Sequence, residues 1–472
     1  MRKTMLSFLL LATSACTTGP NYVRPAAPTA SQTALVTPLP GSTADEGPGP
    51  DWWRTYEDPA LDALIERALA ANTDLRVALA NLRAAEAVVG EARNARLPQT
   101  TINGQGTYGR TQPPLYLPGN RFSGLGSFQL AYEVDLFGRV SRTVEAARAD
   151  AEAAAFARAA VRVRIVAAVT DAYLSACTAS DAITVVRSSI DLTADSARII
   201  GQQERAGSAA RLDVARAEGQ LAEARAALAP FEDARQSALY ELAALLGLPP
   251  AQVPEAAARC GSPPGPHRPI PIGDVAGLLK RRPDVAEAER RLAAATARIG
   301  VASADLYPRI SLGASVAQAG GEGISQSRGF IFGLGPLLSF AFPNNGAARA
   351  RIRQSEARTE AALATFDGTV LTAMKETEQA LSAYGAGLRR QGELRIAVER
   401  SDQAFRLADL RYKAGSIAYV DVIVAQSELV RARLALTEQN RQVASSLVLL
   451  FRALGGGWSP EEPTMIAQGG RR

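Results

Sequence analysis

Several stretches of this chain place apolar residues at helical spacing. Residues 59–96 are rich in Ala and Leu and end before Pro98, and residues 273–306 repeat this arrangement and end before Pro308. Proline cannot continue a helix, because it lacks the backbone N–H and disfavours a helical residue before it. Each stretch therefore predicts one helix that stops at its proline.

A further stretch, residues 141–205, predicts a much longer helix. It contains no proline, and its first glycine is Gly201. Small and apolar residues recur in alternating steps of four and three, which is the heptad pattern by which helices pack together. The predicted seam consists of Ile165, Val169, Ala172, Ala176, Ala179, Ile183, Val186, Ile190, Thr193, Ala197 and Ile200.

Other segments alternate apolar and polar residues with period two, which predicts strands. They are residues 127–136, 309–318 and 330–342, with a weaker fourth at 100–109. Strands of about ten residues with one apolar face are typical of a membrane β-barrel, although a half-buried soluble sheet shows the same alternation. Four strands are too few to close a barrel, because the smallest filled barrels use about eight. If these strands cross a membrane, several chains must share one barrel.

The order of these elements occurs twice. The segment AGSAARLDV begins at Ala206 and AGSIAYVDV begins at Ala414, a separation of 414 − 206 = 208 residues. Other matching pairs keep nearly the same separation: Asp74 with Asp284, Gly90 with Gly300, Pro98 with Pro308, and Gly247 with Gly455. This similarity predicts an internal tandem duplication in which each half has a helix, two strands, a very long helix, a break and a further helix.

The N-terminus predicts export. Two basic residues precede a short apolar run and then small residues, which is the pattern of a secretory signal peptide. The segment TSAC resembles a bacterial lipobox and makes Cys16 the predicted lipidation site, although Thr13 stands where leucine is usual. The alternative is ordinary cleavage beside an incidental cysteine.

The predicted organisation follows from these boundaries. It comprises a signal peptide at 1–15, a lipidated extended tail at 16–50, a first repeat at 51–250, a Pro- and Gly-rich linker at 251–272, a second repeat at 273–458 and a disordered tail at 459–472.

Composition argues against several function classes. Lys and Arg number 52 against 47 for Asp and Glu, and because these charges are interspersed we expect no nucleic-acid partner. The single histidine, His267, leaves no basis for an imidazole metal or catalytic site. Residues 104–109 match the G-x-G-x-x-G fingerprint, but they lie within a predicted strand and not between a strand and a helix. We therefore expect no enzyme activity and no cofactor.

The two AGS segments are predicted turns between helices. Glycine supplies the left-handed conformation, and the serine is expected to cap the helix that restarts. Asp213 and Asp421 then fall in the first turns of the returning helices, where a carboxylate is favoured by the helix dipole.

The chain as a whole resembles the outer-membrane factor family, the TolC-like exit ducts of tripartite efflux systems, and within it the NodT-like and OprM-like lipoproteins. The resemblance rests on CTTGPNYVRP, DWWRTYEDPALDALIERALAANTDL, YEVDLFGRV, LLKRRPDVAEAERRLAAATARIGVASADLYPRISL and RYKAGSIAYVDV. It implies a mainly α fold with β, in which a homotrimer pools four strands per chain into a 12-stranded outer-membrane barrel that continues into an α-helical coiled-coil barrel. It also implies a periplasmic adaptor and an inner-membrane pump of the RND type as partners.

The resemblance further implies the functional positions. Tyr412 and Asp421 match the family's gating tyrosine and first acidic ring, whereas Ile417 and Val424 stand where some members have an arginine and a second aspartate. Asp213 and Arg216 are the first-half candidates for polar links in the gate. The expected adaptor contacts are the turns formed by Ala206, Gly207, Ser208, Ala414, Gly415 and Ser416.

Two cysteines remain, Cys177 in the long helix and Cys260 in the linker. In an oxidising periplasm paired cysteines tend to join, so a disulfide between them is one expectation and two separate thiols is the other.

The sequence therefore predicts a passive exit duct for small molecules, anchored by lipid in the outer membrane. Two alternatives stay open: an exit duct for type I protein secretion, and a periplasmic coiled-coil scaffold without a pore.

Overall fold

The structure, a computed structural model, describes residues 17–25, 35–39, 42–43, 47–110, 119–321, 329–343 and 345–459. The predicted signal peptide, the predicted lipidation site Cys16 and residues 460–472 lie outside the described residues. The contacts divide the chain into two compact units. The first, here the sheet unit, comprises residues 1–26, 80–155 and 286–368. The second, here the hairpin unit, comprises residues 27–79, 156–285 and 369–472.

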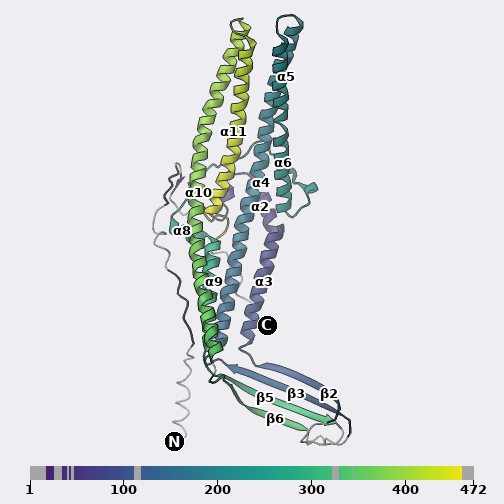
Figure 1. The fold of residues 1–472 in the computed structure, drawn as a ribbon, viewed down its shortest axis with the longest axis vertical. Coiled ribbons are helices and arrows are strands. Elements are labelled where there is room, and N and C mark those ends of the chain that lie inside the picture. Colours follow the sequence, from purple (N-terminus) through teal and green to yellow (C-terminus); the bar gives the residue numbers. More distant parts are fainter. Residues whose placement is uncertain are drawn as a thin grey trace. The chain divides into compact units, whose positions relative to one another are not determined.

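The sheet unit contains four antiparallel strands in the order β2-β3-β5-β6 (Figure 1). They are β2 (Gln99–Gly109), β3 (Arg121–Val134), β5 (Arg309–Gly321) and β6 (Phe330–Ser339). The sheet joins the strand pair of the first half to that of the second half through β3 and β5. The four segments with period-two alternation thus form one sheet.

The register places apolar residues in line on one face of this sheet. Ile102 pairs with Phe128, Phe128 with Val316, and Val316 with Phe332. These four side chains are exposed by 81%, 43%, 43% and 75% of their surface, in that order. The next row of paired residues lies on the opposite face and consists of polar or small residues: Thr101, Gln129, Ser315 and Gly333.

Parts of four helices complete the sheet unit: α3 (Thr73–Asn94), α4 (Arg139–Arg205), α9 (Pro283–Ala304) and α10 (Gly346–Lys413). Small residues let them approach closely. Val89 and Ala92 of α3 pack on Val144 and Ala147 of α4, and Ala149 of the same helix packs against Ala293 and Ala294 of α9.

Residues 17–25 pack along this unit. Thr18 N–H donates to the carbonyl of Phe137 at 3.2 Å, and Arg142 Nε donates to the carbonyl of Thr18 at 3.2 Å. Farther along, Tyr22 donates its hydroxyl hydrogen to the buried carboxylate of Glu289 at 2.7 Å. The segment that follows the predicted anchor is therefore held by specific hydrogen bonds.

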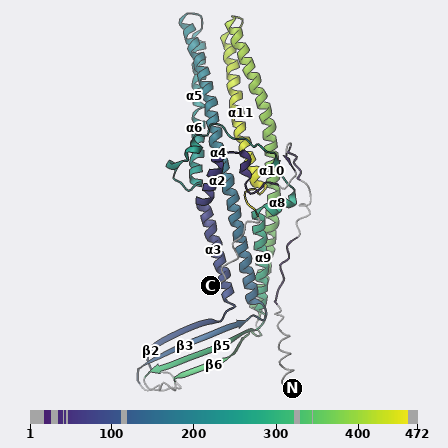
Figure 2. The ribbon, with the colours of Figure 1, turned by 180° about the vertical axis from the view of Figure 1, so that it is seen from behind.

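The hairpin unit is built around the long helices. α4 turns back into α5 (Arg211–Ala226) and α6 (Ala229–Leu245), and α10 turns back into α11 (Tyr419–Ala453), as Figures 1 and 2 show. Nine of the eleven predicted seam residues of α4 are buried, and Ile190 and Ala197 are half-buried. The remaining elements are β1 (Ser42–Thr43), η2 (Trp52–Tyr56), α2 (Pro59–Ala71), η3 (Pro250–Gln252), α7 (Glu255–Ala258), β4 (Ile270–Pro271) and α8 (Val275–Arg281).

The core of the hairpin unit draws on both halves of the sequence. Trp52 stacks on Phe451 of α11 with ring centroids 4.5 Å apart. Val166, Val169 and Cys177 of α4 belong to the same buried cluster. Aromatic stacking adds to the burial of this area, so the short η2 element anchors the start of the first repeat.

The prediction of one continuous helix at 59–96 and another at 273–306 is wrong. Asn72 separates α2 from α3, with an extended ψ of 134°. Its side-chain Oδ1 accepts from the N–H of Asp74 at 2.9 Å, and its Nδ2 donates to the carbonyl of Leu245 at 2.9 Å. In the second half, Pro283 forces the preceding Arg282 out of the helical conformation and separates α8 from α9.

In the part of the chain that the structure describes, no helix is both long and apolar enough to pass through a membrane.

Candidate functional site at the helix hairpins

The two AGS segments form the turns of the two hairpins. Gly207, between α4 and α5, has φ of 76°, and Gly415, between α10 and α11, has φ of 72°. A side chain is disfavoured at these angles, so both positions favour glycine. The four neighbours that were predicted to contact an adaptor, Ala206, Ser208, Ala414 and Ser416, are exposed.

The prediction that serine caps the helix that follows is wrong. Ser208 donates both its N–H and its hydroxyl hydrogen to the carbonyl of Gln203, at 2.8 and 3.0 Å. Ser416 makes the equivalent pair of bonds to the carbonyl of Arg411. Left-handed glycine brings the serine back over the helix that has ended, where carbonyl groups lack partners. Both serines therefore close the C-terminus of the preceding helix.

Tyr412, the predicted gating tyrosine, links the two hairpins. It donates its hydroxyl hydrogen to Gln203 Oε1 on α4 at 2.6 Å. Its ring also meets the ring of Tyr419 edge to face, with centroids 4.9 Å apart. Burial raises the pKa of Tyr419 above its ordinary value, so the Tyr419 hydroxyl keeps its proton at physiological pH.

The predicted acidic residues occupy first turns, as expected. Asp213 accepts a hydrogen bond from the N–H of Ala210 at 3.4 Å, and Arg216 lies 3.9 Å from its carboxylate one turn later. Asp421 is exposed in the first turn of α11. Asp213 and Arg216 thus meet each other within α5.

The structure also brings together residues that the sequence analysis did not single out as a site. Gln426 of α11 lies between Thr193 and Ser196 of α4. The hydroxyl of Ser196 donates to Gln426 Oε1 at 2.9 Å, and Gln426 Nε2 donates to Thr193 Oγ1 at 3.2 Å. Gln426 is 1% exposed. Thr193 is a polar residue in an otherwise apolar seam, which is the one signal in the sequence that could have indicated a polar partner.

Apolar contacts lie between this polar group and the turns. Ile200 of α4, Ala217 of α5 and Ile423 of α11 form a buried cluster, with Tyr419 packed against it. Going toward the turns, α4 therefore meets the second hairpin successively at Gln426, Ile423 and Tyr412.

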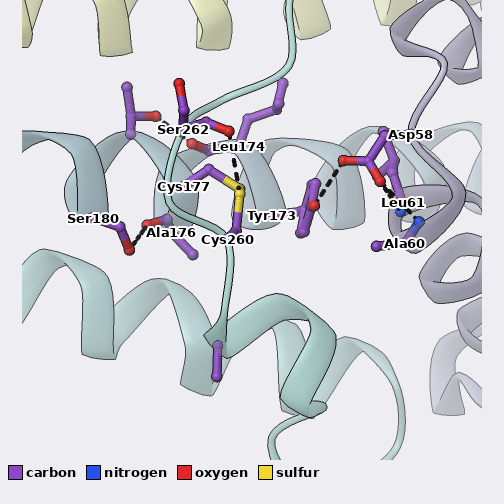
Figure 3. The surroundings of a disulfide bond; sticks show 12 residues. Asp58, Ala60, Leu61, Tyr173, Leu174, Ala176, Cys177, Ser180, Cys260 and Ser262 are labelled. Atoms are coloured by element: carbon purple, nitrogen blue, oxygen red, sulfur yellow. Dashed lines mark hydrogen bonds between the residues drawn. A yellow bond between two sulfur atoms is a disulfide. The ribbon is translucent and has the colours of Figure 1, made fainter.

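Cys177 and Cys260 are joined by a disulfide in the structure, with Cα atoms 5.0 Å apart (Figure 3). Cys177 is fully buried in α4, and the bond fixes the linker between the two halves to that helix. One turn earlier, Tyr173 donates its hydroxyl hydrogen to Asp58 at 2.7 Å. The same part of α4 thus holds both the linker and the start of α2.

Residues 104–109, the segment with the dinucleotide fingerprint, lie inside β2 and pair with β3. This is not the strand-to-helix turn that a dinucleotide requires. In the residues that the structure describes, no group of His, Cys, Asp and Glu is arranged to hold a metal ion.

Comparisons with known proteins agree with this architecture. A family model described as outer membrane efflux protein matches residues 64–248 and 276–456. The outer membrane protein OprJ of Pseudomonas aeruginosa is 35% identical over 486 residues, covering 99% of this chain and 98% of OprJ. The solvent efflux pump outer membrane protein SrpC of Pseudomonas putida is 31% identical, covering 97% of this chain and 98% of SrpC.

Solved structures give the same result. The outer-membrane channel OprN superimposes with a TM-score of 0.84 at 34% identity, covering 94% of this chain and all of the OprN chain. The open state of the MtrE outer membrane channel of Neisseria gonorrhoeae superimposes with a TM-score of 0.80 at 27% identity, covering 94% of this chain and 98% of that one.

The sheet, the helix hairpins and these matches define an outer-membrane channel with a mainly α fold. The chain belongs to the outer membrane efflux protein family. It is an outer-membrane component of an efflux system.

Proposed function

We propose that three copies of this chain assemble into one passive exit duct. The observation that carries this proposal is the four-stranded sheet: its apolar ladder is exposed, and among the described residues its outer strands β2 and β6 each pair on one side only. An open edge in lipid leaves backbone groups without partners at a cost of several kcal/mol each. Three sheets of four strands close into a barrel of 3 × 4 = 12 strands and remove every edge.

The hairpin ends are the proposed gate and docking surface. Tyr412, Asp421, Asp213 and Arg216 lie next to the turns, where a change in helix position alters the opening between neighbouring hairpins. The exposed AGS turns are the proposed contacts of a periplasmic adaptor. Cys16 carries the proposed lipid anchor, because the chain that follows it is held to the sheet unit by Thr18 and Arg142.

The proposed partners are a periplasmic adaptor and an inner-membrane pump of the RND type, which supplies the energy. The proposed cargo is small amphiphilic molecules. This choice is supported by relatives that are named for solvent efflux, toluene efflux and pyoverdine export. Type I protein secretion remains the alternative, and an export assay separates the two.

The assembly is tested with the full-length protein extracted from outer membranes in detergent. Native mass spectrometry should give the mass of three chains, and the same material should conduct ions in a planar bilayer. A monomer that never conducts would refute the duct.

Cargo is tested in a strain that lacks the gene. Loss of this protein should raise intracellular accumulation of a lipophilic dye and leave the secreted proteins unchanged. Unchanged dye accumulation together with a missing secreted protein would favour type I secretion.

A further inference from the structure

Gln426, Thr193 and Ser196, here called the glutamine latch, form a buried polar group between the two hairpins. Three neutral side chains are joined by the two bonds described above, and Ser196 is also hydrogen-bonded to Tyr419. Thr193 in turn donates to the carbonyl of Ser189 one turn earlier in α4, at 2.6 Å. A buried amide without partners would cost several kcal/mol, so the latch is stable only when α11 and α4 keep one axial position.

The neighbouring apolar contacts do not impose this constraint. Ile200 and Ile423 form an apolar contact, and apolar surfaces tolerate small shifts because the hydrophobic effect is non-directional. A polar residue within an apolar helical seam is known instead to specify register, at some cost in stability. The latch is therefore the layer that fixes the register of α4 against α11.

We propose that the glutamine latch is the fixed point of the hairpin ends, and that only the segments beyond it move when the duct opens. These segments are residues 197–210 and 412–425. This inference rests on the proposed function, because it assigns a role within the proposed gate. Gln426 is a positioning residue here. It determines where the second hairpin lies against α4, and thereby it determines the positions of Tyr412 and Asp421.

Position along α11 supports this assignment. Gln426 lies one turn from Ile423 and two turns from Tyr419, on the side of the helix that meets α4. Asp421 and Val424 of the same helix are exposed. If the start of α11 pivots about Gln426, the exposed residues of its first turns therefore move with it.

The chain offers a matched control on the same helix. Gln439 of α11 is 2% exposed, close to the exposure of Gln426. Its Nε2 donates to the carbonyl of Gly387 on α10 at 3.2 Å, so its bond lies within the second hairpin. Gln439→Leu removes a buried amide that makes one hydrogen bond and whose Oε1 has no partner among the described residues, and it leaves the contact between the hairpins intact.

The test compares full-length trimers of the wild type, Gln426→Leu and Gln439→Leu in planar bilayers. We expect Gln426→Leu to raise the ratio of open to closed time about fivefold, because without the latch Tyr412 is no longer held opposite Gln203 and the hydrogen bond that favours the closed state is lost. Gln439→Leu should match the wild type in this ratio. Thermal midpoints measured on the same samples separate a change of register from a general loss of stability.

A double variant sharpens the test. If Thr193 and Gln426 act as one unit, then Thr193→Val with Gln426→Leu should give the same open ratio as Gln426→Leu alone. An equal ratio of open to closed time in the wild type and Gln426→Leu, or additive effects of the two substitutions, would overturn the proposed role of the latch. A wild type that does not conduct would instead overturn the proposed duct, so the two failures are distinguishable.

Discussion

The hydroxyl of Tyr412 on α10 donates to the side-chain oxygen of Gln203 on α4, at 2.6 Å, across the two halves of the duplicated sequence. The two residues lie 209 positions apart, nearly the period of the repeat. The bond therefore joins hairpin ends that occupy corresponding places in the two repeats, and it does so without charge.

We predict that Tyr412→Phe loosens the hairpin ends while keeping the ring contact with Tyr419. One neutral hydrogen bond contributes about 1 kcal/mol, which is about fivefold in the ratio of open to closed time. Planar-bilayer recording of the purified trimer measures this ratio. Gln203→Leu removes the same bond by deleting the acceptor, so the double variant should have the same ratio of open to closed time as either single variant. Additive effects on this ratio would show that loss of the bond is not the cause.

The disulfide between Cys177 and Cys260 should stabilise the hairpin unit. It closes a loop of 83 residues, and the chain-entropy model assigns about 4.5 kcal/mol to a loop of this size. We therefore expect Cys177→Ala/Cys260→Ala to lower the thermal midpoint by several degrees in circular dichroism. Reductant should lower the midpoint of the wild type and leave that of the variant in place; a wild type insensitive to complete reduction would contradict the prediction.

Alkaline pH should destabilise the hairpin unit through Tyr173. Burial raises the pKa of Tyr173, and its hydrogen bond to Asp58 raises it further. A folded pKa above the unfolded value of about 10 means that the unfolded chain loses its proton first. The contribution to stability is then complete below pH 10 and is lost as pH rises toward the folded pKa.

Thermal midpoints between pH 8 and pH 11.5 check this prediction. Tyr173→Phe should flatten the decline above pH 10, although Tyr56 and Tyr384, whose pKa values are also raised by burial, retain part of it. If the thermal midpoint declines with equal slope in Tyr173→Phe and the wild type, groups other than Tyr173 cause the alkaline loss of stability.

The elements that depend on local pattern were predictable from the sequence. The alternation that ends at Leu136 and the heptad steps that begin at Ile165 lie where the structure has β3 and the buried seam of α4. Both patterns arise because one face of the element meets a different medium from the other. The need for apolar residues on one face recurs at regular positions along the strand or helix, so a single sequence is enough to detect it.

The features that depend on distant partners were not predictable. The break at Asn72 is stabilised by the carbonyl of Leu245, 173 positions away, and Gln426 meets Thr193 across 233 positions. Neither residue disturbs its local helical pattern. The role of the serines at the turns was missed for a different reason: Ser208 bonds backward to Gln203, and composition alone does not distinguish a residue that ends one helix from a residue that begins the next.

Close packing of the N-terminal segment predicts sensitivity at Gly19. Its φ is 83°, and a Cβ atom there would lie 2.5 Å from the Cα of Gly300 in α9. Gly19→Ala should therefore detach this segment and speed chymotryptic cleavage after Tyr22 severalfold. Gly90→Ala is the matched control, because its Cβ meets nothing within 4 Å and it lies within α3; equal cleavage rates in the two variants would contradict the close contact.

The two faces of the sheet predict opposite responses to the same charge. Phe128 belongs to the exposed apolar ladder, and Gln129, the next residue of β3, points to the polar face. A lysine that faces lipid costs about 2–4 kcal/mol near the middle of the bilayer, whereas a lysine that faces a water-filled interior costs little. We therefore expect Phe128→Lys to reduce the amount of folded trimer in outer membranes at least several-fold, and Gln129→Lys to leave it near the wild-type level. Semi-native gel electrophoresis of isolated membranes measures both. Equal losses in the two variants would show that the apolar ladder does not face lipid, and the shared barrel would then have no lipid-facing surface on this sheet.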